Sequence, residues 1–424
     1  MREHLDPQFR FRHLYIAGLS GYGKSTLIQA LALQDIQAGE GVCVLDPKGD
    51  LASTLLEWVP SSRIKDVVYL DETTHVPLKL LQWESPEEKR RVMDDVFNII
   101  RRLCENDAGQ RWPFILQRAI QAVVTTRRAF TDINEIIDDE RVRAEIVTDL
   151  IRLNAHQKLI TFWTNFPKPY PFDAGLPITT RLSKITDDDV LSLILGNRDA
   201  KLSIGDDIVE KRKVLIVNLA AFTSQQQQVL GSVIISQIQQ AAFRRMRIGE
   251  PHRIPFFLYC DEFQDFKTST EAAAEMLRKA RGFKISLTLA NQFPTQIEDL
   301  LHDVKGCVSS YVMFKMDPDE ARPLKHKLLP YELEALDSLK EFQAIYRPPN
   351  GASKLITTPK YPTAEENKRR PNHGPLIRLS TLQTFHVPPR QTPPPDAKLK
   401  HDVPRPQPPP NPPRRVPRRG PAPR

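Results

Sequence analysis

Residues 18–26 read GLSGYGKST, and this stretch limits the fold of the chain more than any other. It matches the pattern GxxxxGK[ST], follows the apolar run 14–17, and precedes a helical pattern that begins at Leu27. In that context a glycine-rich loop places backbone N–H groups around a phosphate at the N-terminus of a helix. We therefore expect a strand, a phosphate-binding loop and a helix, in that order, at the start of a βαβ unit. The alternative interpretation is a plain Gly/Ser turn.

The loop supplies the groups that a bound triphosphate needs, namely N–H donors, a cation and a metal ligand. We expect the ammonium group of Lys24 to reach the β and γ phosphates of ATP, and the hydroxyl of Ser25 to hold Mg²⁺. The other residues that we predict to bind the nucleotide are Gly18, Gly21, Tyr22, Gly23 and Thr26.

Short apolar runs alternate with amphipathic helical patterns over most of the chain. We expect strands at 13–17, 42–45, 67–70, 214–219, 255–260, 285–290 and 307–314. Helical patterns fall at 24–38, 224–247, 270–281 and 296–305. Continuous apolar strands linked by helices predict an α/β fold with a mostly parallel sheet that is covered on both faces.

Between the third and fourth of these strands the pattern changes. Apolar residues recur at helical spacing through 90–103, 114–127 and 142–159, and strand-like alternation is lost. We therefore predict one α/β domain made of residues 1–84 and 211–356. A mostly helical insertion at 85–210 interrupts it.

From residue 357 onward the composition no longer favours folding. Residues 361–424 hold 18 of the 37 prolines, and 13 Lys and Arg against 4 Asp and Glu, a net charge of +9. Since the whole chain carries +8, the first 360 residues carry −1. We predict a disordered Pro/Arg-rich tail at 357–424, which could be an inert linker, a ligand for a proline-binding domain or a non-specific nucleic-acid arm.

The strand predicted at 255–260 ends in two adjacent carboxylates, Asp261 and Glu262. In a parallel sheet the carboxyl ends of the strands meet at one edge, so both acids are expected to face the phosphate-binding loop. We assign Asp261 to the Mg²⁺ shell and Glu262 to the base that orients the attacking water, because hydrolysis needs both roles. A surface turn is the alternative.

The sequence DPKGD at 46–50 follows the second predicted strand. It is either a further part of this edge of the sheet or a simple turn.

Two further candidates flank the strand predicted at 285–290. The strand ends in two amides, and we select Gln292 as a sensor of the γ phosphate, with a helix-capping amide as the alternative. The preceding helix ends in Arg278, Lys279 and Arg281, where cations are favourable beside the helix dipole. Phosphoryl transfer also needs positive charge beyond Lys24 and the metal, which an arginine can supply.

Taken together, these stretches resemble the FtsK/HerA branch of P-loop ATPases, most closely the conjugative coupling proteins of type IV secretion and their HerA-like relatives. The resemblance lies in RHLYIAGLSGYGKST, VCVLDPKGDL, RKVLIVNLA, FFLYCDEFQDF and KARGFKISLTLANQF, in this order and over about residues 10–345. It implies a RecA-like sheet, an all-α insertion and a hexameric ring with ATP between subunits. It assigns the following residues: Lys24 and Ser25 to phosphate and Mg²⁺, Asp261 and Glu262 to metal and base, Gln292 to the sensor, and Arg281 to the site of a neighbouring subunit.

The function that the resemblance implies is ATP-driven, non-sequence-specific translocation of DNA by a homo-oligomeric ring, in conjugative or mobile-element transfer with secretion or mobilisation partners. An ATPase that energises protein export or pilus assembly is the alternative, and a nucleotide-dependent scaffold is a third. Scattered cysteines and the lack of a long apolar run indicate a cytoplasmic protein. Coupling proteins usually begin with a transmembrane anchor that this sequence does not show. We therefore expect either that a partner recruits the protein to the inner face of the membrane or that it is a soluble relative that works elsewhere.

Overall fold

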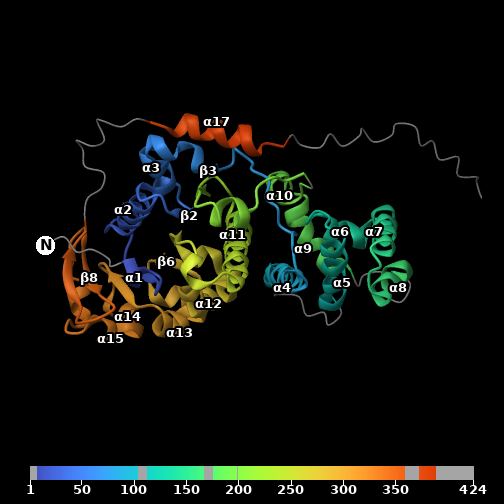
Figure 1. Ribbon diagram of the computed structural model, residues 1–424. Helices are drawn as coiled ribbons and strands as arrows, with labels where there is room; N and C mark the ends of the chain where they lie inside the picture. The colour runs from blue at the N-terminus through green and yellow to red at the C-terminus, as the bar shows by residue number, and fades with distance from the viewer. Residues whose placement is uncertain (1–6, 104–111, 167–174, 198, 359–371, 388–424) are drawn as a thin grey trace, which may run out of the picture. The chain divides into compact units, whose positions relative to one another are not determined.

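The computed structural model of the chain describes residues 7–103, 112–166, 175–197, 199–358 and 372–387 (Figure 1). A nine-stranded sheet has the order β3-β4-β2-β5-β6-β1-β7-β8-β9. Its strands are β1 (Leu14–Ala17), β2 (Gly41–Asp46), β3 (Val67–Leu70), β4 (Val214–Asn218), β5 (Phe256–Cys260), β6 (Ile285–Asn291), β7 (Ser310–Met313), β8 (Gln343–Arg347) and β9 (Lys354–Thr357). Strands β1 to β7 are parallel, whereas β8 and β9 extend one edge in antiparallel fashion. The predicted α/β fold with a mostly parallel sheet is confirmed.

Alternate residues of the strands enter two separate cores. Tyr15 and Cys43 belong to the core on one face, and Ile16 and Val44 belong to the core on the other. The alternation follows from the period of two in a strand, which sends successive side chains to opposite faces. Helices cover both faces of the sheet. The face that carries Ile16 is covered by α2 (Lys24–Gln37) and α3 (Asp50–Trp58). The face that carries Tyr15 is covered by α11 (Ser224–Arg244), α12 (Thr270–Lys279) and α13 (Glu298–Cys307). Burial on both faces explains why the strands are apolar at nearly every position.

Two helices are shorter than their sequence patterns and a third is shifted along the chain, because their end turns tighten into 3-10 geometry. The pattern at 224–247 becomes α11 followed by the turn Arg245–Arg247. The pattern at 270–281 becomes α12 followed by Ala280–Phe283, and α13 is preceded by Pro294–Ile297. Such turns are common at helix ends, and their side chains keep nearly helical spacing. The short helices α1 (Pro7–Arg10), α14 (Pro318–Ala321) and α15 (Lys325–Leu328) complete this part of the chain.

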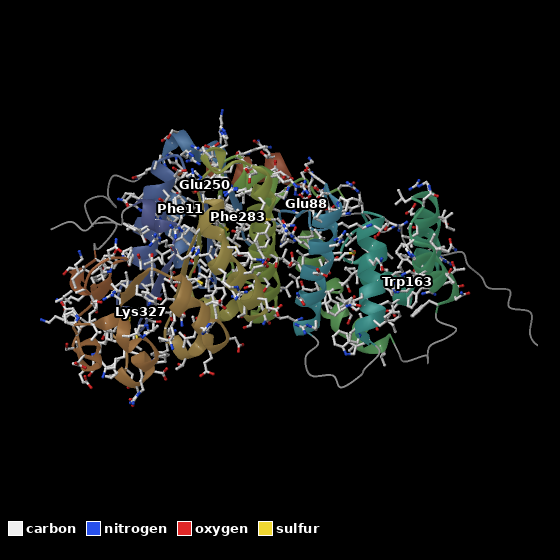
Figure 2. All side chains as sticks on the ribbon, turned by 60° about the horizontal axis from the view of Figure 1, so that its bottom comes forward. Phe11, Glu88, Trp163, Glu250, Phe283 and Lys327 are labelled. Carbon is white, nitrogen blue, oxygen red and sulfur yellow. The ribbon has the colours of Figure 1, made fainter. Side chains whose placement is uncertain are left out.

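Between β3 and β4 the described chain is helical. The helices are α4 (Pro86–Leu103), α5 (Trp112–Thr125), α6 (Asp132–Asp138), α7 (Glu140–Arg152), α8 (Gln157–Asn165), α9 (Leu176–Thr186) and α10 (Asp189–Leu195). Trp163, labelled in Figure 2, is 1% exposed. The centre of its ring lies 4.9 Å from the ring centre of Phe162 and 5.1 Å from that of Phe166. None of the helices in the described ranges combines the length and apolar character that crossing a bilayer requires.

The helical spacing at 142–159 spans two helices, α7 and α8, with a break between them. Asn154 has a left-handed backbone, with φ of 49°, and Asn is one of the few residues that adopts this conformation readily. The ring of His156 then accepts a hydrogen bond from the backbone N–H of Lys158 and caps α8. The apolar spacing continues across the break, so the pattern alone does not locate the end of α7.

The disorder expected from residue 357 is wrong for part of the segment. Helix α17 (Gly374–Phe385), red in Figure 1, contacts β3 and buries Ile377, Thr381 and Phe385. No proline lies between 376 and 387, so the helix can form within a Pro-rich region. The rest of the predicted tail, at 359–371 and 388–424, lies outside the described residues.

Candidate nucleotide-binding site

The phosphate-binding loop connects β1 to α2 at the carboxyl edge of the sheet. Gly18 has φ of 147°, and its N–H donates to the backbone oxygen of Gln292 at 3.1 Å. A Cβ atom on Gly18 would lie 2.5 Å from the Cβ of Phe314, so only glycine fits between the ends of β6 and β7. On the other side of the loop, the N–H of Leu19 donates to the backbone oxygen of Lys315 at 2.8 Å. The neighbouring strands therefore fix the path of the loop.

Helix α2 begins at Lys24 with its first N–H groups uncapped by any side chain. Gly23, at the N-cap, has φ of 113° and provides no side-chain acceptor. These N–H groups and the helix dipole favour an anion at this point. The ammonium of Lys24 is buried and donates to the backbone oxygen of Gly18 at 2.6 Å. Burial lowers the pKa of Lys24, although Glu262 and Asp261 nearby favour its charged form.

Three other residues predicted to bind the nucleotide lie on or near the surface of this turn. Gly21 is exposed with φ of 86°, and Tyr22 and Thr26 are half-buried. The backbone oxygen of Tyr22 accepts from the N–H of Phe342 at 2.9 Å, and the ammonium of Lys315 lies 5.9 Å from the centre of its ring. Tyr22 is therefore anchored by its backbone, with its ring beside a cation.

Ser25 and Asp261 meet although 236 positions separate them. The hydroxyl of Ser25 donates to Oδ2 of Asp261 at 2.6 Å. Asp261 is placed by the end of β5, where its N–H donates to the backbone oxygen of Leu45 in β2 at 3.1 Å. Burial raises the pKa of this carboxyl, and the hydrogen bond from Ser25 partly opposes that effect. A hydroxyl and a carboxylate side by side are the hard oxygen ligands that Mg²⁺ prefers.

Glu262 lies next to this pair, and its carboxylate is held by two donors. The ammonium of Lys48 donates to Oε1, and Nε2 of Gln264 donates to Oε2 at 2.8 Å. The side chain of Glu262 is 2% exposed, and burial raises its pKa. The hydrogen bonds from Lys48 and Gln264 and the charges of Lys24 and Lys48 together outweigh this effect, so the pKa of Glu262 lies below its ordinary value. Lys48 comes from the DPKGD turn, which the sequence indicated only as a stretch near the nucleotide.

Gln292 follows β6 and lies beside the loop, since its backbone oxygen accepts from Gly18. β6 is the strand between β5, which precedes the carboxylates, and β1, which precedes the loop. The side chain of Gln292 is not the cap of the following turn. Instead, Oε1 of Gln296 accepts from the backbone N–H groups of Gln292 and Phe293, each at 3.0 Å.

Arg281 is not brought to this site within the subunit. It is exposed in the turn Ala280–Phe283, ahead of β6, whereas Gln292 comes after that strand. β6 has seven residues, so about 20 Å separates its two ends. The neighbouring cations are engaged elsewhere, with Arg278 paired to Asp303 at 2.8 Å and Lys279 paired to Glu275 at 2.6 Å.

This sheet order and loop define the class of protein: a P-loop NTPase fold of the RecA-like type, with the loop strand and the carboxylate strand separated by β6. No family model and no curated protein matches the sequence. Among solved structures, the fold is that of the bacterial conjugative coupling protein TrwB.

The plasmid coupling protein TrwB in complex with ADP and Mg²⁺ superimposes with a TM-score of 0.59 and 13% identity, over 84% of this chain and 87% of that one. TrwB with a non-hydrolysable GTP analogue superimposes with a TM-score of 0.59 and 13% sequence identity, over 82% of this chain and 85% of that one. VirB4 of Thermoanaerobacter pseudethanolicus superimposes with a TM-score of 0.58 and 12% sequence identity, over 82% of this chain and 90% of that one. At these identities the likeness is one of fold, and it confirms at that level the resemblance to coupling proteins.

Proposed function

We propose that this protein is an ATP-hydrolysing, ring-forming motor that moves DNA in conjugative or mobile-element transfer. The observation that carries the proposal is the meeting of Lys24, Ser25, Asp261 and Glu262 at one edge of the sheet. This set supplies a phosphate cradle, a metal-ligand pair and a separate carboxylate, which are the parts that phosphoryl transfer to water requires.

The residues have distinct roles in the proposed reaction. The N–H groups at the start of α2 and the ammonium of Lys24 bind the β and γ phosphates. Ser25 and Asp261 hold Mg²⁺, which neutralises phosphate charge when bound. Glu262 accepts a hydrogen bond from the attacking water and orients it toward the γ phosphorus. Gln292, whose backbone oxygen accepts from Gly18, is the proposed sensor of the γ phosphate.

Three parts of the proposal, namely ring assembly, DNA as the substrate and the cellular location, are supported by the resemblance of the motifs and by the fold shared with the coupling protein TrwB. A hexamer would place Arg281 of one subunit at the nucleotide of the next. We place the protein in the cytoplasm, recruited to the inner face of the membrane by a secretion or mobilisation partner. The protein-export or pilus-assembly ATPase stays the second candidate, because VirB4 has the same fold at a TM-score of 0.58.

The test of the motor is the ATPase rate of the full-length chain with and without single- and double-stranded DNA, at several salt concentrations. We expect DNA to stimulate turnover, with an effect that weakens as salt rises, because phosphate contacts release counterions. Turnover that DNA leaves unchanged at every salt concentration would favour the protein-export candidate. No turnover under any condition would contradict the ATPase itself.

The test of the site is Lys24→Ala. Removing the ammonium that reaches the phosphates should lower the ATPase rate by about 10²-fold or more. Lys211→Met, which removes one charge from an exposed pair with Asp207, is the control and should keep its activity. Unaltered turnover in Lys24→Ala would refute the assignment of the phosphate-binding loop.

A further inference from the structure

The turn that carries Lys48 is held at its backbone, whereas the Lys48 side chain is partly exposed. Oδ1 of Asp46 accepts from the N–H of Lys48 at 3.0 Å, and Oδ2 accepts from the N–H of Ala52 at 2.8 Å. Nε2 of Gln227, from α11, donates to the backbone oxygen of Pro47 at 3.3 Å. The Lys48 side chain is 47% exposed, so it can move while the turn stays in place.

The ammonium of Lys48 lies between the phosphate-binding loop and the carboxylate assigned as the base. It donates to Oε1 of Glu262 and lies 3.4 Å from the hydroxyl of Ser20, the third residue of the loop. With Gln264 on Oε2, both oxygens of Glu262 accept hydrogen bonds from the chain itself. Two of the about four acceptor positions of the carboxylate are then engaged, which leaves fewer for a water molecule.

Two cations and several carboxylates share the site. Lys24 and Lys48 both interact with Asp261 and Glu262, and Lys48 also interacts with Asp265. A triphosphate adds several negative charges to the loop, and ammonium groups bind phosphate oxygens strongly as point charges. Lys48 would then have two competing anions, of which the terminal phosphate carries more charge than the Glu262 carboxylate.

We propose that Lys48 is a positioning residue that holds Glu262 until a terminal phosphate binds, and then exchanges the carboxylate for that phosphate. The exchange frees Oε1 of Glu262 for the attacking water only when a triphosphate is present. The proposal rests on the proposed nucleotide site. It makes binding of the terminal phosphate and release of Glu262 one coupled event.

The test is a double-mutant cycle on binding, which does not depend on turnover. Dissociation constants for a non-hydrolysable ATP analogue and for ADP are measured with Mg²⁺ for the full-length chain, Lys48→Met, Glu262→Gln and the double variant. Glu262→Gln removes the charge that competes for Lys48, so it should tighten binding of the analogue by about fivefold or more. In the Lys48→Met background that gain should disappear, and ADP affinity should stay within about twofold in all four proteins.

Two further variants keep the interpretation specific. Lys48→Arg retains the cation and should restore the coupling at least in part, and Lys211→Met controls for net charge and should behave as the parent. The proposal is overturned if the effects of the two substitutions on the analogue multiply independently, or if Lys48→Met weakens ADP as much as the analogue. If the parent binds neither nucleotide, the proposed nucleotide site itself fails. If the parent protein shows the coupling between Lys48 and Glu262 but does not hydrolyse ATP, the proposed motor function fails and the proposed nucleotide site stands.

Discussion

Glu262 has a left-handed backbone, with φ of 45°, at the carboxyl end of β5. Such a conformation costs a non-glycine residue about 1–3 kcal/mol, and it persists only where surrounding contacts determine it. Here the neighbours supply those contacts: Oδ1 of Asp261 accepts from the N–H of Glu262 at 3.1 Å, and Lys48 and Gln264 hold its carboxylate. The backbone therefore turns the side chain toward the phosphate-binding loop instead of continuing the line of the strand.

His13, just ahead of β1, gives a prediction on pH and stability. Its ring is buried, Nδ1 accepts from the N–H of Leu287 at 3.1 Å, and burial lowers its pKa from 6.5 to about 4. As pH falls from 6.5, the unfolded chain binds the proton first, so stability is full above this pH and is lost toward pH 4. Over that range the loss due to His13 is about 3 kcal/mol.

The variant His13→Asn should flatten this part of the stability curve. Asn tolerates the left-handed backbone of this position, where φ is 64°, keeps an acceptor for Leu287 and does not titrate. Urea unfolding of both proteins between pH 7 and pH 4.5 measures the difference. Parallel curves for parent and variant over this range would contradict the assigned pKa shift.

At the scale of elements, α17 covers the edge strand β3 and satisfies part of its free backbone. The N–H of Tyr69 donates to the hydroxyl oxygen of Thr381 at 3.1 Å, and Arg378 pairs with Asp71 while lying 4.5 Å from the ring of Tyr69. Unpaired edge strands invite pairing with other chains. In this protein a helix that comes after every strand in sequence closes that edge.

Thr381→Val tests this role, because it keeps the shape of the side chain but removes the acceptor. The N–H of Tyr69 would be buried without a partner, so we expect the free energy of unfolding to fall by about 1–3 kcal/mol. Faster hydrogen exchange at the Tyr69 amide should accompany the loss. Thr384→Val is the matched control: this exposed hydroxyl bonds only within α17, and the change should stay within about 0.5 kcal/mol. Equal effects of the two substitutions would argue against the edge contact.

The elements that the sequence predicted best are those with strong periodicity and clear ends. β3 agrees exactly with the expected 67–70, and α2 ends one residue before the expected helix. β8 and β9 were missed, because their pattern of burial is weaker and β9 exposes alternate residues, including Leu355. α17 was missed because the composition of the whole tail outweighed one short proline-free stretch.

At the scale of the whole molecule, Arg281 and Glu262 lie toward opposite ends of the parallel strands of one subunit. An arginine that acts on a nucleotide from there must act on that of another subunit. Arg281→Ala should therefore bind ATP normally but hydrolyse it about 10³-fold more slowly. Arg278→Ala is the control, since that arginine pairs with Asp303, and it should keep most of its activity.

Mixing subunits distinguishes this role from a structural one. Glu262→Gln subunits lack the base but carry Arg281, so mixed rings should contain some interfaces with both groups intact. The ATPase rate of the mixture should exceed that of either variant alone. If no mixing ratio recovers turnover, the role of Arg281 across the interface loses its support.

From the residues alone we predicted the α/β fold, the path from β1 through the loop to α2, and the candidate groups Lys24, Ser25, Asp261 and Glu262. These depend on local patterns, since a glycine-rich turn after an apolar strand and two acids at a strand end can be recognised from neighbouring residues. Two other features became known only from the folded chain: Lys48 contacts Glu262 from 214 positions away, and α17 closes the edge at β3. Such contacts depend on strand order and side-chain reach, which arise only when distant segments pack into one sheet, and no local periodicity encodes them.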